Sequence, residues 1–510
     1  MTFLKVAVFV VVIVISIGTT RAAYFTPTTS PMPTLFPIAT YNTSVLYGAN
    51  VTGYDSPFLL ANISGPTRFS IGYAWATLLA TRSIENYGFI MQAICNGDAL
   101  VQGILELFLD IQFHLFATQQ LPQEYQEELR GIRQAMSDAG FQTHSMITDR
   151  AVVLSSFPGD VASNIEWLLL NELGLGPHFF ARRNSLQDGA KARGIHFESQ
   201  VKAVLETAAK FFHRSCSHFG VWGSRTDTGE LYTGRNLDWL ANSGIAQNKL
   251  LTIVHPPEVG RFPHVAIAFA GMWGALTGMG ASGITVHESG DDNKMETLQG
   301  FSWTLRLRYI MEMASTMSEA LALWRATNNT LGINHGIGSA KSRQYVAIET
   351  KASYSAYFFD NDTREAQRII NGTQYGFPLT EAVWRTNHGY DPTWLSTAID
   401  PKPGKDTFAR YMLLHDTFLL YASQGTGAIG ALEAVNLTAI VGDKGDPPTP
   451  ERFTTCPAQN PGGINVLSAT FLPERHKLFV AFENGLNATH TVACCNPYVE
   501  MDMTKFWGPF

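Results

Sequence analysis

Charge is scarce in this sequence. Asp, Glu, Lys and Arg make up 15% of the 510 residues, whereas hydrophobic residues make up 45%. This balance predicts a large apolar core beneath a rather uncharged surface. The net charge of −7 lacks the basic excess that nucleic-acid-binding proteins carry, so we expect no nucleic-acid partner.

Long apolar runs are also missing, except at the N-terminus. Val6 to Gly18 is apolar and uncharged, Lys5 precedes it, and Thr20-Arg21-Ala22 follows with small residues at −3 and −1 of a cleavage site. A run of about 13 residues is too short to span a bilayer comfortably. We therefore predict a signal peptide over residues 1–22 and no stable membrane span elsewhere.

Metal and nucleotide motifs are absent or weak. The histidines show neither His-Glu-x-x-His nor paired Cys-x-x-Cys spacing, so we predict no metal site. Gly278-x-Gly280-x-x-Gly283 matches a dinucleotide fingerprint. Such a turn must open a helix, however, and Ile284 to Val286 is typical of a strand. We therefore expect no cofactor.

The cysteines are few and odd in number: Cys95, Cys216, Cys456, Cys494 and Cys495. An odd number in a secreted protein points to one reactive thiol. If Cys216 is that thiol, the other four could form two disulfides, although a bridge between the adjacent Cys494 and Cys495 would be strained. Pairing of Cys95 with a C-terminal cysteine would join the two halves of a cleaved chain, and the connectivity stays open.

Glycosylation signals are frequent. Asn-x-Ser/Thr triplets without a central proline begin at Asn42, Asn50, Asn62, Asn328, Asn361, Asn371, Asn436 and Asn487. Together with a signal peptide, this density predicts a glycoprotein of the secretory pathway, either secreted or lysosomal.

The N-terminal part, residues 23–215, is expected to be a mainly helical pro-segment or subunit. Residues 23–66, rich in Thr, Pro, Ser and Asn, are interpreted as an irregular lead-in. Apolar residues at three- and four-residue steps predict helices within 84–119, with a break at Asn96-Gly97. Further helices are expected over 122–139, 161–173 and 198–213.

The sequence pattern of residues 216–510 predicts strands with interspersed helices. Short apolar runs bounded by Gly and Pro predict strands at 250–254, 264–269, 283–286, 345–349 and 355–359, and a hairpin of 465–472 with 477–482. Helices are expected over 302–313, over 320–326 behind a capping box from Thr316 to Glu319, and over 408–422. This order predicts an α+β protein with stacked sheets covered by helices.

A hairpin from Cys216 to Trp239 carries the candidate chemistry. It begins on a cysteine and ends near Arg235 and Asp238, which places a nucleophile beside two charges able to orient it. If the Ser215–Cys216 bond is cut, the new α-amine, with a pKa of about 7.7–8.0, can take the proton of its own thiol, whose pKa is about 8.5. A buried structural cysteine on a strand is the alternative interpretation.

Cys216-Ser217, the following glycine-containing turn and Gly234-Arg-Asn-Leu-Asp-Trp239 resemble the N-terminal nucleophile hydrolases, a group with acid ceramidase, choloylglycine hydrolase and penicillin acyltransferases. The resemblance continues through Gly278–Val286, Met317–Leu323, Arg385–His388 and Phe408–Tyr411. One departure is Gly280-Ala281, which stands where the family has Asn-Glu.

The resemblance implies a four-layer αββα sandwich, no cofactor and a set of site residues. Cys216 would be both nucleophile and base, and Arg235 and Asp238 would position it. Asn387 would lend its side-chain NH₂ to an oxyanion hole. Arg410 would be a further charge near the nucleophile.

The predicted activity is that of a self-cleaving cysteine amidase. Cleavage of Ser215–Cys216 would leave an N-terminal fragment as a partner of residues 216–510, which would hydrolyse the non-peptide C–N bond of a small acyl amide. Aromatic residues, 12% of the chain, could line an apolar acyl pocket and favour a lipid-like substrate. The alternatives are an acyltransferase, a phospholipase or esterase of the same superfamily, and a secreted binding glycoprotein that keeps the fold without cleaving.

Overall fold

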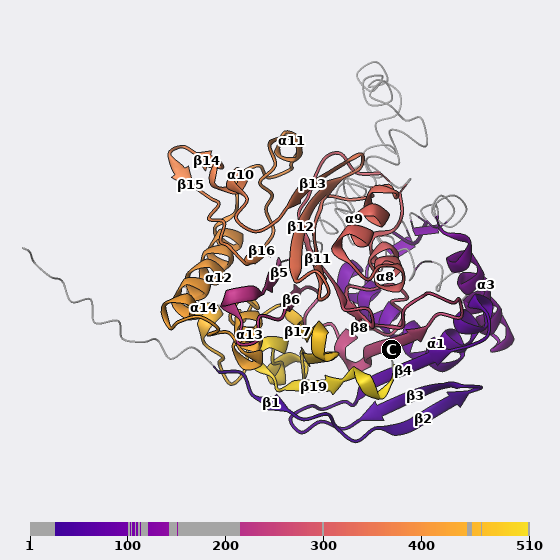
Figure 1. The fold of residues 1–510 in the computed structure, drawn as a ribbon. Helices are drawn as coiled ribbons and strands as arrows, with labels where there is room; N and C mark the ends of the chain where they lie inside the picture. Colours follow the sequence, from indigo (N-terminus) through magenta and orange to yellow (C-terminus); the bar gives the residue numbers. More distant parts are fainter. Residues whose placement is uncertain are drawn as a thin grey trace, which may run out of the picture.

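The structure, a computed structural model, describes residues 26–99, some of 102–113, 121–141, 150, 215–297, 300–445, 451–460 and 462–507. Their strands form two large sheets that lie face to face, with helices on both outer faces (Figure 1). Side chains bridge the two sheets: Tyr345 bonds to His218 over 2.8 Å. This is the predicted α+β architecture, and its four layers confirm the αββα sandwich.

The first sheet has seven strands and contains the predicted hairpin. Their order across the sheet is β1 (Thr29–Ser30), β19 (Tyr498–Asp502), β18 (Lys477–Phe482), β17 (Asn465–Leu472), β6 (Tyr232–Asp238), β5 (Ser215–Val221) and β16 (Ala382–Arg385). β5 and β6 pair antiparallel, with Cys216 opposite Leu237. The hairpin expected at 465–482 is β17 with β18, so both sequence-predicted hairpins are confirmed.

The second sheet has ten strands. Their order is β13 (Tyr354–Phe358), β12 (Gln344–Lys351), β11 (Ile333–Ser339), β10 (Ile284–Gly290), β9 (Thr277–Gly280), β8 (His264–Phe269), β7 (Lys249–His255), β4 (Phe58–Ser64), β3 (Ser44–Ala49) and β2 (Phe36–Tyr41). A separate pair joins β14 (Ile369–Ile370) to β15 (Thr373–Gln374). All five strands predicted after Cys216 are present.

The expectation of an irregular segment over residues 23–66 is wrong. β2, β3 and β4 form one end of the ten-stranded sheet, and β4 runs parallel to β7. Leu59, Ala61 and Ile63 of β4 are fully buried. The Thr- and Pro-rich composition was misleading because a strand inserted between two others draws its stability from burial and long-range pairing.

Two long helices of the N-terminal part cross at close range. α1 (Arg68–Cys95) ends at Asn96, whose φ of 48° is left-handed, so the predicted break there is confirmed. α3 (Gln123–Asp138) matches the helix predicted over 122–139. A Cβ atom on Gly72 of α1 would lie 1.9 Å from the backbone oxygen of Glu128 in α3, so only glycine permits this contact. The helices predicted over 161–173 and 198–213 lie outside the described residues.

The remaining helices cover the two sheets. α8 (Trp303–Met313) and α9 (Met317–Arg325) contact the ten-stranded sheet, and α12 (Lys405–Ser423) and α13 (Ala431–Ile440) contact the seven-stranded one (Figure 1). The predicted capping box of Thr316 and Glu319 opens α9. The short helices are α10 (Thr363–Ala366), α11 (Pro392–Leu395), α14 (Glu451–Thr454), η4 (Gly223–Arg225), η5 (Ile245–Asn248), η6 (Pro473–Arg475), η7 (Asn487–Thr489), η8 (Ala493–Cys495) and η9 (Met503–Lys505).

A buried ionic network ties the N-terminal helices to the rest of the chain. Arg68 at the start of α1 reaches Glu128 of α3 over 2.8 Å and Glu312 of α8 over 2.9 Å. Arg308 of α8 pairs with the same two carboxylates. Removing one member of such a network leaves a buried charge without a partner, which typically lowers the free energy of unfolding by about 3–5 kcal/mol.

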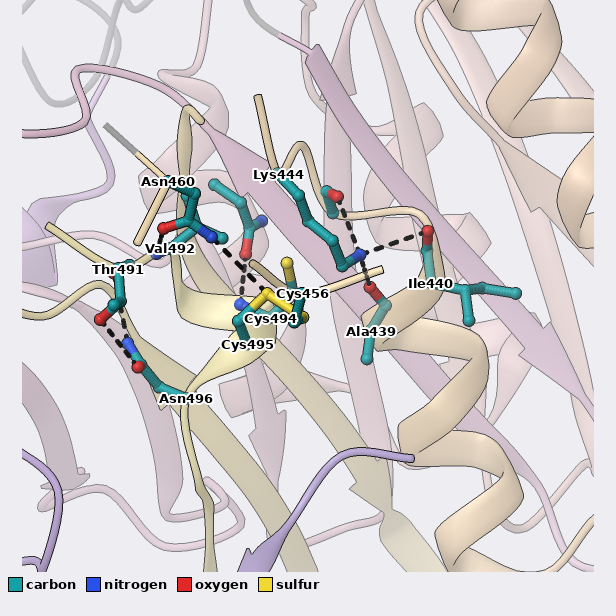
Figure 2. Close-up of a disulfide and its surroundings, with 12 residues drawn as sticks. Ala439, Ile440, Lys444, Cys456, Asn460, Thr491, Val492, Cys494, Cys495 and Asn496 are labelled. Atoms are coloured by element: carbon teal, nitrogen blue, oxygen red, sulfur yellow. Dashed lines mark hydrogen bonds between the residues drawn. A yellow bond between two sulfur atoms is a disulfide. The ribbon is translucent and has the colours of Figure 1, made fainter. Parts of the chain in front are cut away.

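One disulfide, Cys456–Cys495, is present among the described residues (Figure 2). Two bridges with Cys95 in one of them were considered from the sequence, and that pairing is wrong. Cys95 ends α1, whereas Cys494 lies in η8 beside the disulfide, so the two thiols belong to different core clusters. Burial raises the pKa of both thiols to about 11, which makes them inert.

Candidate active site

Cys216 lies on β5 with its side chain fully buried between the sheets. On β6, Arg235 is the partner of His218 and Leu237 that of Cys216. Because paired residues project to one face and alternate residues share it, Cys216 and Arg235 point the same way. Nη2 of Arg235 is 3.9 Å from the Cys216 sulfur. The structure thus brings this predicted pair together.

Glu288 is a member of the site that sequence reasoning missed. It lies on β10 of the facing sheet, is fully buried, and forms an ion pair with Nη2 of Arg235. Its backbone oxygen also accepts from Nε of Arg235 at 3.4 Å. A glutamate that continues the apolar run Ile284-Thr-Val286 was the available signal, because a buried carboxylate needs a partner.

Asn387 and Arg410 hold the backbone of Cys216. The N–H of Cys216 donates to Oδ1 of Asn387 at 2.8 Å, and Nη1 of Arg410 donates to the backbone oxygen of Cys216 at 2.6 Å. Oδ1 of Asn387 also accepts from Arg410 at 2.9 Å. The NH₂ group therefore points the other way and donates to Gly290 at 2.6 Å. The oxyanion-hole role of that NH₂ stays a prediction.

Asp238 occupies the opposite face of the hairpin, directly across from Ser215 in the strand ladder. Its Oδ1 accepts from Asn465 at 2.6 Å, whereas its buried Oδ2 has no hydrogen-bond partner among the described residues. Burial raises the pKa of this carboxyl to about 7, with Arg410 opposing the shift and Asp443 adding to it. A buried carboxyl with a raised pKa therefore lies opposite Ser215, one residue before the Cys216 nitrogen.

Ser215 and its surroundings add residues that the sequence did not single out. The Ser215 hydroxyl donates to Oδ2 of Asp406 at 3.1 Å and accepts from Nη2 of Arg410 at 3.2 Å. Arg452 lies 3.1 Å from the other oxygen of Asp406. The signal available for Asp406 was its i,i+4 spacing from Arg410 in α12.

The histidines near the hairpin are neutral structural groups. Burial, with Arg385 adding to it, lowers the pKa of His218 to about 3, which makes it a poor general base at neutral pH. His218 bonds to Tyr345, and His388 bonds to Tyr390 over 2.8 Å. These contacts agree with a structural role for both histidines.

No cluster of three His, Cys, Asp or Glu side chains suited to a metal ion occurs in the described part of the chain. The glycine-rich segment from Gly278 to Gly283 joins β9 to β10, so the helix that a dinucleotide turn requires is not there. Within the described residues, no helix is long and apolar enough to cross a membrane. Residues 1–22 lie outside them.

The predicted glycosylation sites are mostly accessible. Six acceptor asparagines are exposed: Asn42, Asn50, Asn328, Asn361, Asn371 and Asn487. Asn62 and Asn436 are half-buried, and Asn436 lies within α13. Glycan attachment at any of these positions remains a prediction.

Comparison with known proteins places this site in a class. The family model described as acyl-coenzyme A:6-aminopenicillanic acid acyl-transferase matches residues 224–419. That segment contains Arg235, Asp238, Glu288, Asn387 and Arg410. With the four-layer sandwich, it shows that the chain has the N-terminal nucleophile hydrolase fold. The resemblance to the N-terminal nucleophile hydrolases inferred from the sequence is confirmed over this segment.

Several solved structures are similar to this chain. The N-acylethanolamine-hydrolyzing acid amidase ortholog of Caenorhabditis elegans is 16% identical with a TM-score of 0.34, covering 51% of this chain and 93% of that one. A conjugated bile acid hydrolase mutant from Clostridium perfringens is 13% identical with a TM-score of 0.37, covering 57% and 93%. Penicillin V acylase from Agrobacterium tumefaciens is 13% identical with a TM-score of 0.27, covering 57% and 87%. No curated protein sequence matches this chain.

Proposed function

We propose that this chain is a self-cleaving cysteine amidase that hydrolyses the non-peptide C–N bond of an acyl amide. The observation that carries the proposal is the arrangement around Cys216. A guanidinium lies 3.9 Å from its sulfur, and Asn387 and Arg410 hold its N–H and C=O. Any buried residue needs partners for its backbone N–H and C=O. The guanidinium beside the sulfur is different, because a merely structural thiol packs as a small apolar group and needs no cation.

Self-cleavage begins with addition of the Cys216 thiol to the carbonyl carbon of Ser215. The C–N bond between the two residues then breaks, the nitrogen takes a proton and becomes an amine, and a thioester joins Ser215 to the sulfur. Water hydrolyses the thioester to a Ser215 carboxylate and a free thiol. We expect Asp238, across the ladder from Ser215, to orient the new ammonium together with Asn387, whose Oδ1 accepts from the Cys216 N–H at 2.8 Å.

Hydrolysis of the substrate uses the same Cys216 thiol and the nitrogen freed by self-cleavage. The α-amine of Cys216 takes the thiol proton, and the thiolate attacks the acyl carbon of the substrate. Arg235 stabilises the negative charge on sulfur before the attack. The protonated amine then gives its proton to the leaving nitrogen, and water releases the acyl group as a carboxylic acid.

N-terminal sequencing of the purified protein tests the proposal most directly. We expect a fragment that begins Cys-Ser-His-Phe, together with hydrolysis of acyl amides. A single uncut chain without activity would instead identify a binding glycoprotein that keeps the fold.

We also propose that the N-terminal fragment stays bound after cleavage. β4 pairs with β7 over six residue pairs, and Arg68 reaches Glu258 as well as Glu312 across the cut. Separating the fragments would expose an edge of the ten-stranded sheet and leave buried charges without partners. Size-exclusion chromatography of the cleaved protein should show both fragments in one peak.

Acyl transfer is the second candidate function, because the matching family model describes an acyl-transferase. In that case an amine rather than water would take the acyl group from the thioester. A panel of acyl amides, esters and amine acceptors, with products measured by mass spectrometry, separates the two. Activity on esters alone would identify the phospholipase or esterase alternative. Substrates with long acyl chains are the first to test.

Secretory targeting is part of the proposal. The disulfide Cys456–Cys495 and the six exposed sequon asparagines support an oxidising, glycosylating compartment. Deglycosylation should increase the electrophoretic mobility of the protein, and its mature N-terminus should lie near residue 23.

A further inference from the structure

The side chain of Ser215, just before the bond proposed to be cut, lies between Asp406 and Arg410, which we call the polar cradle. Ser215 donates its hydroxyl hydrogen to Asp406 at 3.1 Å and accepts from Arg410 at 3.2 Å. The side chain of Arg410 is 1% exposed and that of Asp406 is 34% exposed. One hydroxyl therefore satisfies a buried cation and a half-buried carboxylate at once.

Contacts with residues other than Ser215 hold Asp406 and Arg410 in position. Asp406 and Arg410 pair along α12 at 2.8 Å. Arg452 lies 3.1 Å from Asp406 and 2.6 Å from Asp443, while Arg410 is anchored on Asn387. These contacts do not involve Ser215, so the acceptor and the donor stay in place when the Ser215 carboxylate leaves.

The thiol that attacks Ser215 is also the thiol that attacks the substrate. Both acyl groups become thioesters on the same sulfur, so atoms at equal distances from the carbonyl reach similar places. In Ser215 the hydroxyl sits on the carbon β to the scissile carbonyl. We propose that Asp406 and Arg410 form a hydroxyl subsite, and that the enzyme prefers acyl amides with a hydroxyl on the β carbon. This inference rests on the proposed self-cleavage and amidase activity.

The charges of the cradle select the ligand class. A carboxylate at this position would face Asp406, and an ammonium would face Arg410, so each would meet a like charge. A methyl group would leave both groups without their shared partner. A hydroxyl both donates and accepts, which matches the two contacts that Ser215 makes.

Substrate preference is the first test. The mature protein is assayed with dodecanoyl 4-nitroanilide and with each enantiomer of its 3-hydroxy analogue. We expect kcat/KM to be about ten- to hundred-fold higher for one enantiomer, a range typical of a hydrogen bond to charged groups. Asp406→Asn should lose most of this preference. Asp416→Asn, on the exposed side of the same helix with 67% of its side chain accessible, should keep it. Equal rates for all three substrates would overturn the proposal.

Self-cleavage of two isosteric variants is the second test. Ser215→Thr keeps the hydroxyl, and Ser215→Val replaces it by a methyl of the same shape. We expect the Val variant to cleave at least about ten-fold more slowly than the Thr variant. Equal cleavage would show that the cradle carries no binding energy. A wild-type chain that never produces the Cys216 N-terminus would refute the proposed function, whereas one that cleaves but hydrolyses no amide would refute only the amidase. In that case the Thr and Val pair still decides whether the subsite exists.

Discussion

Two buried charge networks in this molecule differ in how completely their members are paired. In the network around Arg68, each guanidinium nitrogen donates to a carboxylate, and both oxygens of Glu128 accept. Around Cys216, by contrast, Nη1 of Arg235, Oδ2 of Asp238 and Oε2 of Glu288 have no hydrogen-bond partner among the described residues.

This difference in hydrogen-bond pairing indicates a different role for each network. Paired guanidinium and carboxylate groups fix helices in place, since these charges are satisfied only in the native arrangement. The pairing around Arg68 is confined to these charged groups, because both ring nitrogens of His264, which lies 3.8 Å from Glu312, have no hydrogen-bond partner among the described residues. Buried groups left unpaired cost stability, and such groups persist where a substrate or a reaction intermediate uses them. The pairing around Arg68 fits a role in assembly, and the unpaired atoms around Cys216 fit the reactive role proposed above.

Cys216→Ala should produce the largest effect. Without the thiol, the chain should show neither self-cleavage nor amidase activity, as read by N-terminal sequencing and product formation. Cys95→Ala is the matched control, since that thiol is buried at the end of α1 with its pKa raised to about 11, and both activities should survive. Cleavage that persists in the Cys216 variant would move the nucleophile elsewhere.

Arg68→Ala should weaken the assembly network without removing the reactive one. We expect the free energy of unfolding to fall by about 3–5 kcal/mol, because Glu128 and Glu312 lose a buried partner. Arg130→Ala breaks the exposed pair with Glu127 and should change stability by at most about 1 kcal/mol. Urea unfolding of the uncut Cys216→Ala chain measures both, and equal losses would contradict the comparison.

Asp238→Asn should change how stability depends on pH. The carboxyl has a pKa of about 7 in the folded chain and about 3.9 when unfolded. The folded state therefore keeps a proton that the unfolded state has lost, and the free energy of unfolding falls as pH rises from about 4 to 7. The variant lacks this fall and should gain roughly 2–4 kcal/mol on its parent between pH 4.5 and 7.5.

Urea unfolding at those two pH values, again on the uncut Cys216→Ala background, is the measurement for Asp238. Burial also raises the pKa of Glu349 to about 7, so the difference between variant and parent is what counts. Parallel pH dependences in the two chains would show that Asp238 titrates normally.

The double variant Arg235→Gln, Glu288→Gln should have the smallest effect. It keeps the size of the Glu288 side chain, shortens that of Arg235 and leaves no buried charge unpaired, so it should cost less stability than either single variant. The thiolate loses its neighbouring cation, and the pH profile of self-cleavage should move up by about one unit, a roughly ten-fold slower rate at neutral pH. An unchanged profile would show that Arg235 only fills space.

The local features of the fold could be predicted from the sequence. The break at Asn96, the capping box at Thr316 and the hairpin of β17 with β18 depend on residues close in the chain. The strands β2 to β4 were missed because the Thr- and Pro-rich composition hid their pattern, although β2, β3 and β4 pair locally. The pairing of β4 with β7, almost 200 positions further on, is one that no local pattern encodes.

The sequence by itself determined the centre of the candidate site. Cys216, Arg235 and Asp238 lie on one hairpin, so their spacing alone brings them near one another. Asn387 and Arg410 came from the family resemblance, and their contacts with Cys216 became visible only in the folded chain. Their roles in catalysis remain to be tested by the variants above.

Tertiary structure alone decided the rest. Glu288 reaches Arg235 only because the two sheets pack face to face, and Asp406 reaches Ser215 only because α12 packs beside the start of β5. Such contacts join residues 53 and 191 positions apart, and no local pattern encodes them. Spacing along a strand fixes which side chains share a face, but packing fixes which charge they meet.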